Sequence, residues 1–200
     1  MTFRLDKPTM KTNHISQIFR SLDRELWIVT AGNSEQRGGM ISTTVCQASI
    51  VDDLPRIIMG VGNHHFTHEL IAATGCFVLN TIAENQLDRL WSFGLETGHD
   101  IDKLAGFRLQ QGTTGTPILA DAPAWLECKV EASFDTGDRT LFLAEVLDGH
   151  QTSDEKPLTI QQAVKRANAS QLQALMSHKS ADGLIEAAAI RKWRDNEITD

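Results

Sequence analysis

Apolar and polar residues alternate along Trp125–Phe134, and this pattern constrains the fold more than any other feature of the sequence. One face of the segment carries Leu126, Cys128, Val130, Ala132 and Phe134, and the other carries Glu127, Lys129, Glu131 and Ser133. A period of two is typical of an antiparallel strand with one buried face and one face in solvent. The turn residues Asp135–Asp138 and the apolar segment Leu141–Leu147 follow directly, which predicts a β-hairpin.

Four more apolar segments upstream have the length and composition of strands. Leu26–Ala31 and Cys76–Thr81 are short and apolar, and Met40–Val51 is joined to Arg56–Val61 by the turn residues Asp52–Pro55. Everything through residue 150 fits one antiparallel barrel with helices at its ends. The fold class expected is therefore mainly β with peripheral helices.

Apolar residues at helical spacing occur at three places within this predicted barrel. Thr12–Leu22 predicts an amphipathic helix that covers one end of the barrel, and Ala83–Phe93 predicts a second helix. The segment 67–75 predicts a short helix, with Thr67 as its N-cap and Gly75 as its C-terminal stop.

The character of the chain changes at Thr152. The polar segment Ser153–Pro157 precedes a region with few strand formers, in which Thr159–Met176 and Leu184–Trp193 predict two helices separated at Gly183. We therefore expect a barrel domain over residues 1–151 and a helical extension over residues 152–200. The extension packs on the barrel or on a partner subunit, with coverage of a ligand as the alternative.

Charge and composition exclude several classes of function. A net charge of −7 argues against a nucleic-acid surface, which needs a basic face. No apolar run approaches the length of a membrane span, and residues 1–10 lack the apolar core of a signal peptide, so we expect a cytoplasmic protein. The three cysteines form no C-x-x-C pair and are expected to be small buried apolar side chains.

Short hydroxyl side chains gather in the first of the two joined apolar runs, at Ser42, Thr43, Thr44 and Ser49. Small side chains on a strand let a flat ligand lie against the backbone, whose polar groups can bind its edge. The second run ends in Asn63, His64, His65, Phe66 and Thr67, at the start of a helix whose free N–H groups favour a phosphate. These residues predict a site for a planar, phosphorylated ligand. The alternative is that the threonines only satisfy β propensity.

The order of these residues resembles that of a known family. The run GMISTTVCQAS over 39–49, Leu54-Pro55, Asn63 to Thr67 and Phe77–Asn80 together resemble the flavin reductase-like, FMN-binding split-barrel family, over residues 20–150. The resemblance implies an antiparallel split β-barrel, a homodimer with FMN near the subunit interface, and reduction of flavin by NADH or NADPH. It makes the following residues the cofactor-binding candidates: Ser42, Thr43, Thr44, Cys46, Ser49, Asn63, His64, His65 and Thr67.

The same resemblance points to the predicted hairpin. The family often carries a Gly-Asp-His motif there, whose histidine helps to place the nicotinamide nucleotide, and the matching residues are Gly137, Asp138 and Arg139. Asp138 and Arg139 are thus the nicotinamide-positioning candidates, and no residue is assigned a catalytic role. An arginine can bind a phosphate with two N–H groups, but its presence can equally mean that nicotinamide recognition is lost. A third possibility is that the residues only form a turn.

The histidines also raise the question of a metal. His64 and His68 are four residues apart and His65 adjoins them, but His64 precedes the predicted helix and no cysteine or carboxylate at ligand spacing completes a set. We therefore expect no metal. As donors to a phosphate, the imidazoles would make binding sensitive to pH near their ordinary pKa of about 6.5.

The preferred function is an NAD(P)H-dependent FMN reductase that delivers reduced flavin to a monooxygenase or another electron-acceptor protein. The alternative is a non-enzymatic FMN-binding electron carrier or redox sensor that takes electrons from a protein partner. A third hypothesis keeps the barrel but exchanges FMN for another flat phosphorylated cofactor. Haem fits less well, because a haem pocket has no use for the block of hydroxyl groups.

Overall fold

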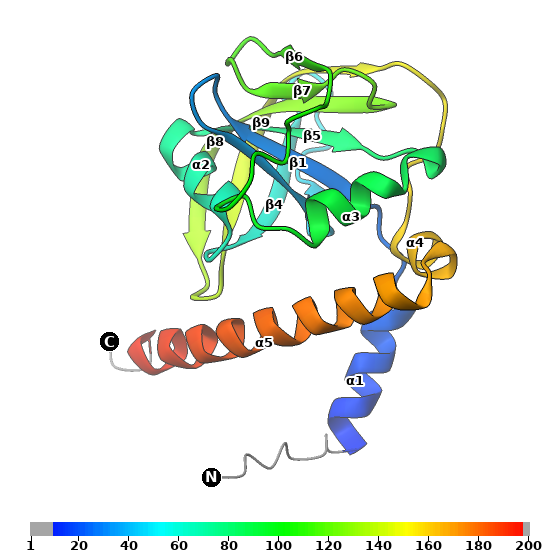
Figure 1. Cartoon of the computed structure of the whole chain (residues 1–200). Coiled ribbons are helices and arrows are strands. Elements are labelled where there is room, and N and C mark those ends of the chain that lie inside the picture. Colours follow the sequence, from blue (N-terminus) through cyan, green and yellow to red (C-terminus); the bar gives the residue numbers. More distant parts are fainter. Residues whose placement is uncertain (1–9, 198–200) are drawn as a thin grey trace.

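Seven antiparallel strands form one sheet in the computed structural model, which describes residues 10–197. The sheet curls into a half-barrel (Figure 1) with the strand order β2-β1-β5-β8-β9-β4-β3. Its strands are β1 (Trp27–Gly32), β2 (Arg37–Ser42), β3 (Val45–Gln47), β4 (Arg56–Gly62), β5 (Cys76–Thr81), β8 (Ala124–Asp135) and β9 (Arg139–Gln151). The predicted mainly β, antiparallel fold is confirmed, with β5 and the β8–β9 hairpin at the predicted places.

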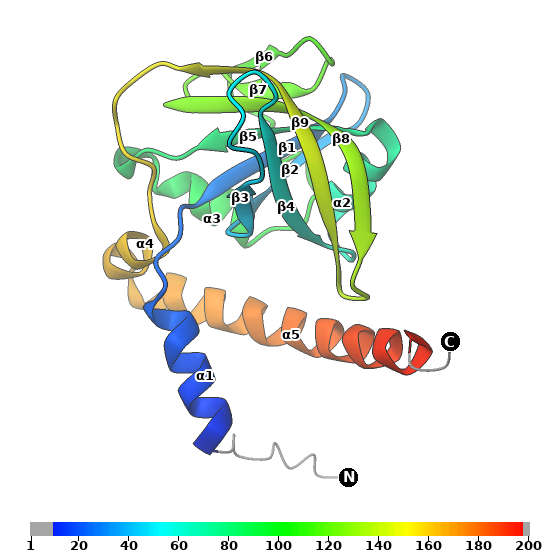
Figure 2. The same ribbon diagram turned by 180° about the vertical axis from the view of Figure 1, so that it is seen from behind.

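A second, two-stranded sheet and several helices lie around this half-barrel (Figures 1 and 2). The small sheet consists of β6 (Leu109–Gln111) and β7 (Pro117–Leu119). The helices are α1 (Met10–Ser21), α2 (Phe66–Thr74), the 3-10 helix η1 (Glu84–Gln86), α3 (Asp88–Gly94), α4 (Ile160–Arg166) and α5 (Ala169–Glu197). No helix within residues 10–197 is both long and apolar enough to cross a membrane.

Two apolar clusters hold the fold together, one on each face of the curled sheet. The first joins strand residues to Leu70 and Ile71 of α2, and its fully buried members include Val29, Met59, Val61, Phe77 and Leu79. The second joins the opposite face to α3 and to the chain on either side of β7, and includes Ile28, Ile82, Phe93, Leu104 and Leu158. Burial of this apolar surface supplies the main favourable term in folding.

The first apolar run is not one strand. β2 ends at Ser42 and β3 starts at Val45, with a turn between them in which the backbone N–H of Thr44 donates to Oγ of Ser42 over 3.2 Å. Short hydroxyl side chains bond to nearby backbone in this way and compete with a sheet ladder. The carbonyl of Thr44 still accepts from the N–H of Gly60 over 2.9 Å, so the turn stays against β4.

The predicted solvent face of β8 is wrong at Glu127, which is fully buried. The carboxylate accepts hydrogen bonds from the backbone N–H and the hydroxyl of both Thr113 and Thr114, in the β6–β7 turn. Phe134 was predicted to lie on the buried face of the strand, but it is 60% exposed. A bulge between Val130 and Ala132 shifts the register, and the end of the hairpin extends beyond the core.

The predicted positions of the outer helices are also partly wrong. α1 does not cover the barrel but projects away from it (Figures 1 and 2), with Ile18 62% and Phe19 64% exposed. The extension breaks between α4 and α5 rather than at Gly183, because Asn168 caps α5 by accepting from the N–H of Gln171 over 2.9 Å. A glycine inside a helix costs only about 1 kcal/mol relative to alanine, so α5 runs through Gly183.

Candidate functional site

Asn63 ties the end of β4 to the turn between β8 and β9. Its backbone N–H donates to the carbonyl of Asp138 over 2.9 Å, and its amide Nδ2 donates to Oδ1 of Asp135 over 2.9 Å and to the carbonyl of Gly137 over 3.1 Å. Its Oδ1 accepts from the hydroxyl of Thr140 over 2.8 Å. These bonds join two parts of the predicted site. Both Nδ2 and Oδ1 of the Asn63 side chain are bonded to protein groups.

His64 and His65 follow directly, with their ring centroids 4.2 Å apart. Both rings lie against Gly62, where a Cβ atom would come within 3.0 Å of Cδ2 of His65 and 3.1 Å of Cε1 of His64. Nε2 of His64 is buried and has no hydrogen-bond partner within residues 10–197. Oδ1 of Asp182 lies 3.5 Å from this atom, beyond the usual length of a hydrogen bond, so a ligand that forms a shorter bond would satisfy it.

Burial, followed by the neighbouring charge of His64, lowers the pKa of His65 to about 4. His65 is therefore neutral near pH 7, because the desolvated ring disfavours its charged form. The pH sensitivity near 6.5 predicted for an imidazole in this loop does not apply to His65, whose titration falls well below that range.

Helix α2 begins at Phe66, so the predicted N-cap at Thr67 is wrong. The N-cap is His65, whose side chain makes no capping bond, and Thr67 lies in the first turn, where it is 3% exposed. The C-terminal stop at Gly75 is confirmed, with φ at 68° and its N–H bonded to the carbonyl of Ile71. The N-terminus of α2 thus places free N–H groups and the positive end of a helix dipole beside the two histidines.

The hydroxyl block lies next to the same strand. Cγ2 of Thr44 is 2.9 Å from where a Cβ atom of Gly60 would stand, and Gly60 and Gly62 project to one face of β4 because they are two residues apart. The β2–β3 turn and the histidines therefore meet the same face of β4, separated by about 7 Å along the strand. Of the other predicted residues, Ser42 is buried and Thr43 half-buried in this turn.

Cys46 and Ser49 lie farther along the chain than the turn. Cys46 belongs to β3, an edge strand, where it pairs with Ile58 and is exposed, so the expectation that all three cysteines are buried is wrong there. Ser49 accepts the N–H of Val51 over 3.1 Å. Cys128 is buried as expected, and burial raises the pKa of its thiol to about 12.

The predicted nicotinamide-positioning residues form the tip of the β8–β9 hairpin. Nε of Arg139 donates to Oδ2 of Asp138 over 2.7 Å, and Nη2 of Arg139 lies 2.9 Å from Oε1 of Glu186 in α5. Burial acts to raise the pKa of Asp138, but the hydrogen bond and charge of Arg139 outweigh it and hold that pKa below its usual range. The guanidinium is thus bound by carboxylates from two separate elements.

Helix α5 brings residues to the site that the sequence did not indicate. Oδ1 of Asp182 lies 3.5 Å from Nε2 of His64, and Trp193 packs against Phe134 with ring centroids 6.5 Å apart. His64, His65 and Asp182 together present three potential metal-ligand atoms within 4.8 Å of one another. A carboxylate thus stands near the two imidazoles, although none is at ligand spacing in the sequence. The sequence feature that could have indicated them is the helical spacing of Asp182 and Glu186, which puts both carboxylates on one side of a helix.

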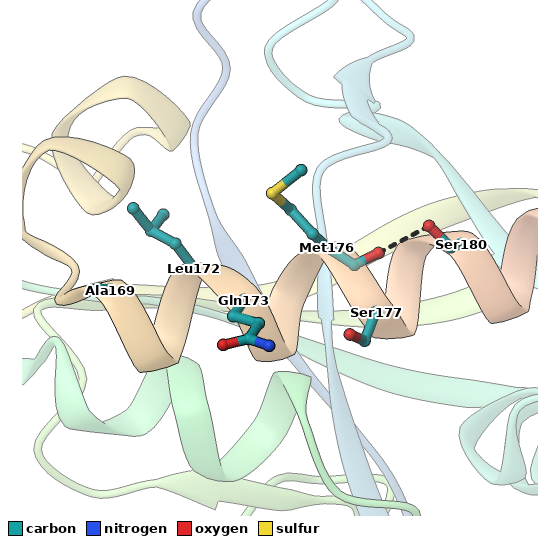
Figure 3. Close-up of a pocket in the computed structure, with 6 residues that line it drawn as sticks. All are labelled: Ala169, Leu172, Gln173, Met176, Ser177 and Ser180. Carbon is teal, nitrogen blue, oxygen red and sulfur yellow. Dashed lines mark hydrogen bonds between the residues drawn. The ribbon is translucent and has the colours of Figure 1, made fainter.

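Two hollows lie elsewhere on the surface, and the second reaches Phe66, the first residue of α2. One, of about 710 Å³, follows the first half of α5 (Figure 3), where Leu172 and Met176 project from one side of the helix, and its lining holds no titratable group. The other, of about 410 Å³, lies between the β1–β2 turn and the segment 98–102, and is bordered by the ion pair of Arg37 and Asp102 at 2.8 Å. Neither contains the predicted cofactor-binding residues.

Comparison with known proteins identifies the family. Residues 19–168 match the model of the flavin reductase like domain. The chain belongs to this family. The flavin reductase-like chain is 31% identical to the high molecular weight rubredoxin of Moorella thermoacetica, over 72% of its own length and 63% of that protein. It is 27% identical to the FMN reductase (NADH) RutF of Pseudomonas syringae, over 60% of its length and 66% of that protein. It therefore spans less than two thirds of each.

Solved structures of the family share the fold of this flavin reductase-like chain. The NADH:FAD oxidoreductase SgcE6 of Streptomyces globisporus superimposes with a TM-score of 0.66 at 22% identity, covering 80% of this chain and 93% of that one. The flavoredoxin of Methanosarcina acetivorans superimposes with a TM-score of 0.61 at 19% identity, covering 82% and 83%. The predicted split-barrel fold and the family resemblance are both confirmed.

Proposed function

We propose that this chain binds FMN between the β2–β3 turn and helix α2 and reduces it with NADH or NADPH. The observation that carries the proposal is the buried Nε2 of His64, which makes no hydrogen bond within residues 10–197 and lies beside the N-terminus of α2. A phosphate satisfies both features, because it accepts hydrogen bonds and its negative charge is favoured at a helix N-terminus. Gly62 keeps space for the two rings, and Thr67 lies in the first turn of the same helix.

The hydroxyl groups of Thr43 and Thr44 are suited to the polar edge and the ribityl chain of the flavin. The side chain of Thr44 lies against the face of β4 that also meets the histidines, so one extended ligand can contact both groups. Bound FMN supplies the redox chemistry, since it accepts a hydride from a nicotinamide. The contribution of the protein is orientation, because hydride transfer needs the reacting atoms held about 3–3.5 Å apart.

Arg139 is proposed to hold a phosphate of the nicotinamide nucleotide. Its guanidinium lies at the hairpin tip that Asn63 joins to His64, so a nucleotide held there would approach a flavin held by the histidines. The names of two relatives support reductase activity: one is an NADH-dependent FMN reductase at 27% identity and another is an NADH:FAD oxidoreductase with the same fold. The choice of FMN over FAD depends on the His64 region, which offers donors for a terminal phosphate.

One observation favours a second function, a non-enzymatic FMN-binding electron carrier or redox sensor. Arg139 is already bound by Asp138 and Glu186, and engagement of this kind would leave nicotinamide unrecognised. Electrons would then come from a protein partner. In either case the proposal includes a homodimer with flavin near the interface, a barrel domain over 1–151, a helical extension over 152–200, and a cytoplasmic location. The acceptor is a monooxygenase or another electron-acceptor protein.

The deciding experiment is anaerobic mixing of the FMN-loaded protein with NADH or NADPH, following the visible absorbance of the flavin. Fast bleaching with either nucleotide is the result expected for a reductase. If neither nucleotide bleaches the flavin but dithionite does, the reductase assignment fails and the carrier or sensor takes its place. A protein that neither holds nor reduces flavin would overturn both functions.

A further inference from the structure

Helix α5 turns one acidic face toward the site. Asp182, Glu186, Ala189 and Trp193 are four, three and four residues apart, which places them on one side of a helix. The structure carries this side along the histidines and the hairpin: Asp182 meets His64, Glu186 meets Arg139, and Trp193 lies over Gly137. In Figures 1 and 2 the helix runs beneath the half-barrel at the end where the β8–β9 hairpin projects.

The two carboxylates of this face contact the same groups that we assign to phosphates. Oδ1 of Asp182 is 3.5 Å from Nε2 of His64, and Oε1 of Glu186 is 2.9 Å from Nη2 of Arg139. Phosphate oxygens and carboxylate oxygens compete for the same N–H donors, and arginine binds both in the same forked manner. An anionic ligand and α5 therefore compete for N–H groups of these two side chains.

We propose that Asp182 and Glu186 act as an intramolecular substitute for a phosphate, and that the phosphate of a bound nucleotide displaces α5 from His64 and Arg139. The inference rests on the proposed function for the identity of the ligand, FMN or a nicotinamide nucleotide. It assigns α5 the role of a competitor that sets the apparent affinity for phosphorylated ligands. A ligand without phosphate, such as riboflavin, gains nothing from removal of the two carboxylates.

The contacts of α5 with the site are of a kind that can be exchanged. The paired side chains are partly open to solvent, with 23% of His64 and 41% of Asp182 accessible, and ion pairs so exposed are weak and screened by salt. Two apolar residues between these contacts are largely open to solvent, with Leu184 71% and Ile185 51% exposed. The packing of Trp193 against Phe134 and Gly137 is an apolar contact that release of this part of α5 must break.

The first test compares three full-length proteins in titrations with FMN and with riboflavin. The double variant D182N/E186Q removes both carboxylates, and the control D154N/E155Q makes the same change in net charge in the exposed linker that follows β9. If α5 occupies the site nine-tenths of the time, the double variant binds FMN about tenfold more tightly than wild type, while riboflavin affinity stays the same. Equal FMN affinity in all three proteins, or equal tightening for both ligands, overturns the inference.

The second test follows α5 directly in the wild-type chain by amide hydrogen exchange of residues 180–193. Exchange is expected to rise when FMN is added and also with inorganic phosphate, but not with riboflavin. The same measurement with NADPH in place of FMN identifies which phosphorylated ligand displaces the helix: the one that raises exchange. Slower exchange with FMN would mean that α5 closes over the ligand, and binding of Zn²⁺ that retains α5 would mean that Asp182 is a metal ligand. Either result overturns the competitor role.

The two tests separate this inference from the proposed function. If FMN binds but neither its affinity nor the exchange of α5 responds as expected, the inference fails and flavin binding stands. If no flavin binds while inorganic phosphate still raises the exchange of α5, the flavin assignment fails and the displacement by phosphate stands.

Discussion

The hydroxyl of Thr140 in β9 donates a 2.8 Å hydrogen bond to Oδ1 of Asn63 at the end of β4. With the two bonds from Nδ2 of Asn63, it fixes the loop of His64 and His65 against the β8–β9 turn. Replacement of Asn63 by alanine removes all three side-chain bonds. At about 1 kcal/mol for each, Asn63→Ala is expected to lower the free energy of unfolding by about 2–3 kcal/mol, and to weaken FMN binding as the loop loosens.

The control for this variant is Asn33→Ala. Asn33 makes two comparable bonds in the β1–β2 turn, where its Oδ1 accepts from the N–H groups of Glu35 and Gln36. Asn33→Ala should lower the free energy of unfolding measured by urea denaturation, without a change in FMN affinity. If both variants bind FMN as the wild type does, Asn63 has only a structural role.

Thr67 tests the phosphate end of the proposed site, because it lies in the first turn of α2 next to the histidines. Thr67→Ala is expected to weaken FMN binding about tenfold, the loss of one hydrogen bond to a charged group, with less than about a twofold effect on riboflavin. Thr74→Ala, at the other end of the same helix, controls for damage to α2 because it removes the bond from the Thr74 hydroxyl to the carbonyl of Leu70. Equal loss of FMN and riboflavin in Thr67→Ala would refute the assignment of the phosphate.

His65 predicts a specific dependence of stability on pH. Its pKa is about 4 in the folded chain and 6.5 in the unfolded chain, so between these values the unfolded state binds more protons. Stability is therefore complete above pH 6.5 and declines as the pH falls toward 4, by at most about 3 kcal/mol. Urea denaturation across this range should show a smaller decline for His65→Gln than for wild type.

The control for His65→Gln is His150→Gln, which makes the same substitution at an exposed histidine on β9. His150→Gln should retain the full decline of the wild type. Part of the decline should also persist in His65→Gln, because burial lowers the pKa of His68 as well. An unchanged decline in His65→Gln would show that the ring of His65 is not desolvated in solution.

Local patterns account for the parts of the fold that the sequence predicted. The strand Cys76–Thr81, the stop at Gly75 and the hairpin at Asp135–Asp138 each depend on a few consecutive residues, and all three are confirmed. Thr67 illustrates the usual error in such predictions. The residue type suits an N-cap, but the N-cap of α2 is His65, two residues earlier, and helix ends are the least certain feature of a pattern.

Contacts between distant segments account for the parts that the sequence could not predict. Glu127 alternates like a solvent residue, and only the β6–β7 turn, which places Thr113 and Thr114 around it, makes burial of its carboxylate favourable. The pairing of Asp182 with His64 is of the same kind, because no pattern within α5 indicates which part of the barrel it meets. The sequence motif therefore indicated the part of the candidate site that the barrel supplies. It did not indicate the part that α5 supplies.

Gly137 gives a way to release α5 without altering its carboxylates. Its φ is +88°, and a Cβ atom there would come within 2.5 Å of Cβ of Trp193 and 2.9 Å of the carbonyl of Ala189. Gly137→Ala should therefore raise amide exchange in α5 as well as cost about 1–2 kcal/mol of stability from backbone strain. Gly115→Ala supplies the strain alone, since Gly115 has a φ of +81° and open space around it. Similar exchange of α5 in the two variants would show that the helix does not rest on the hairpin in solution.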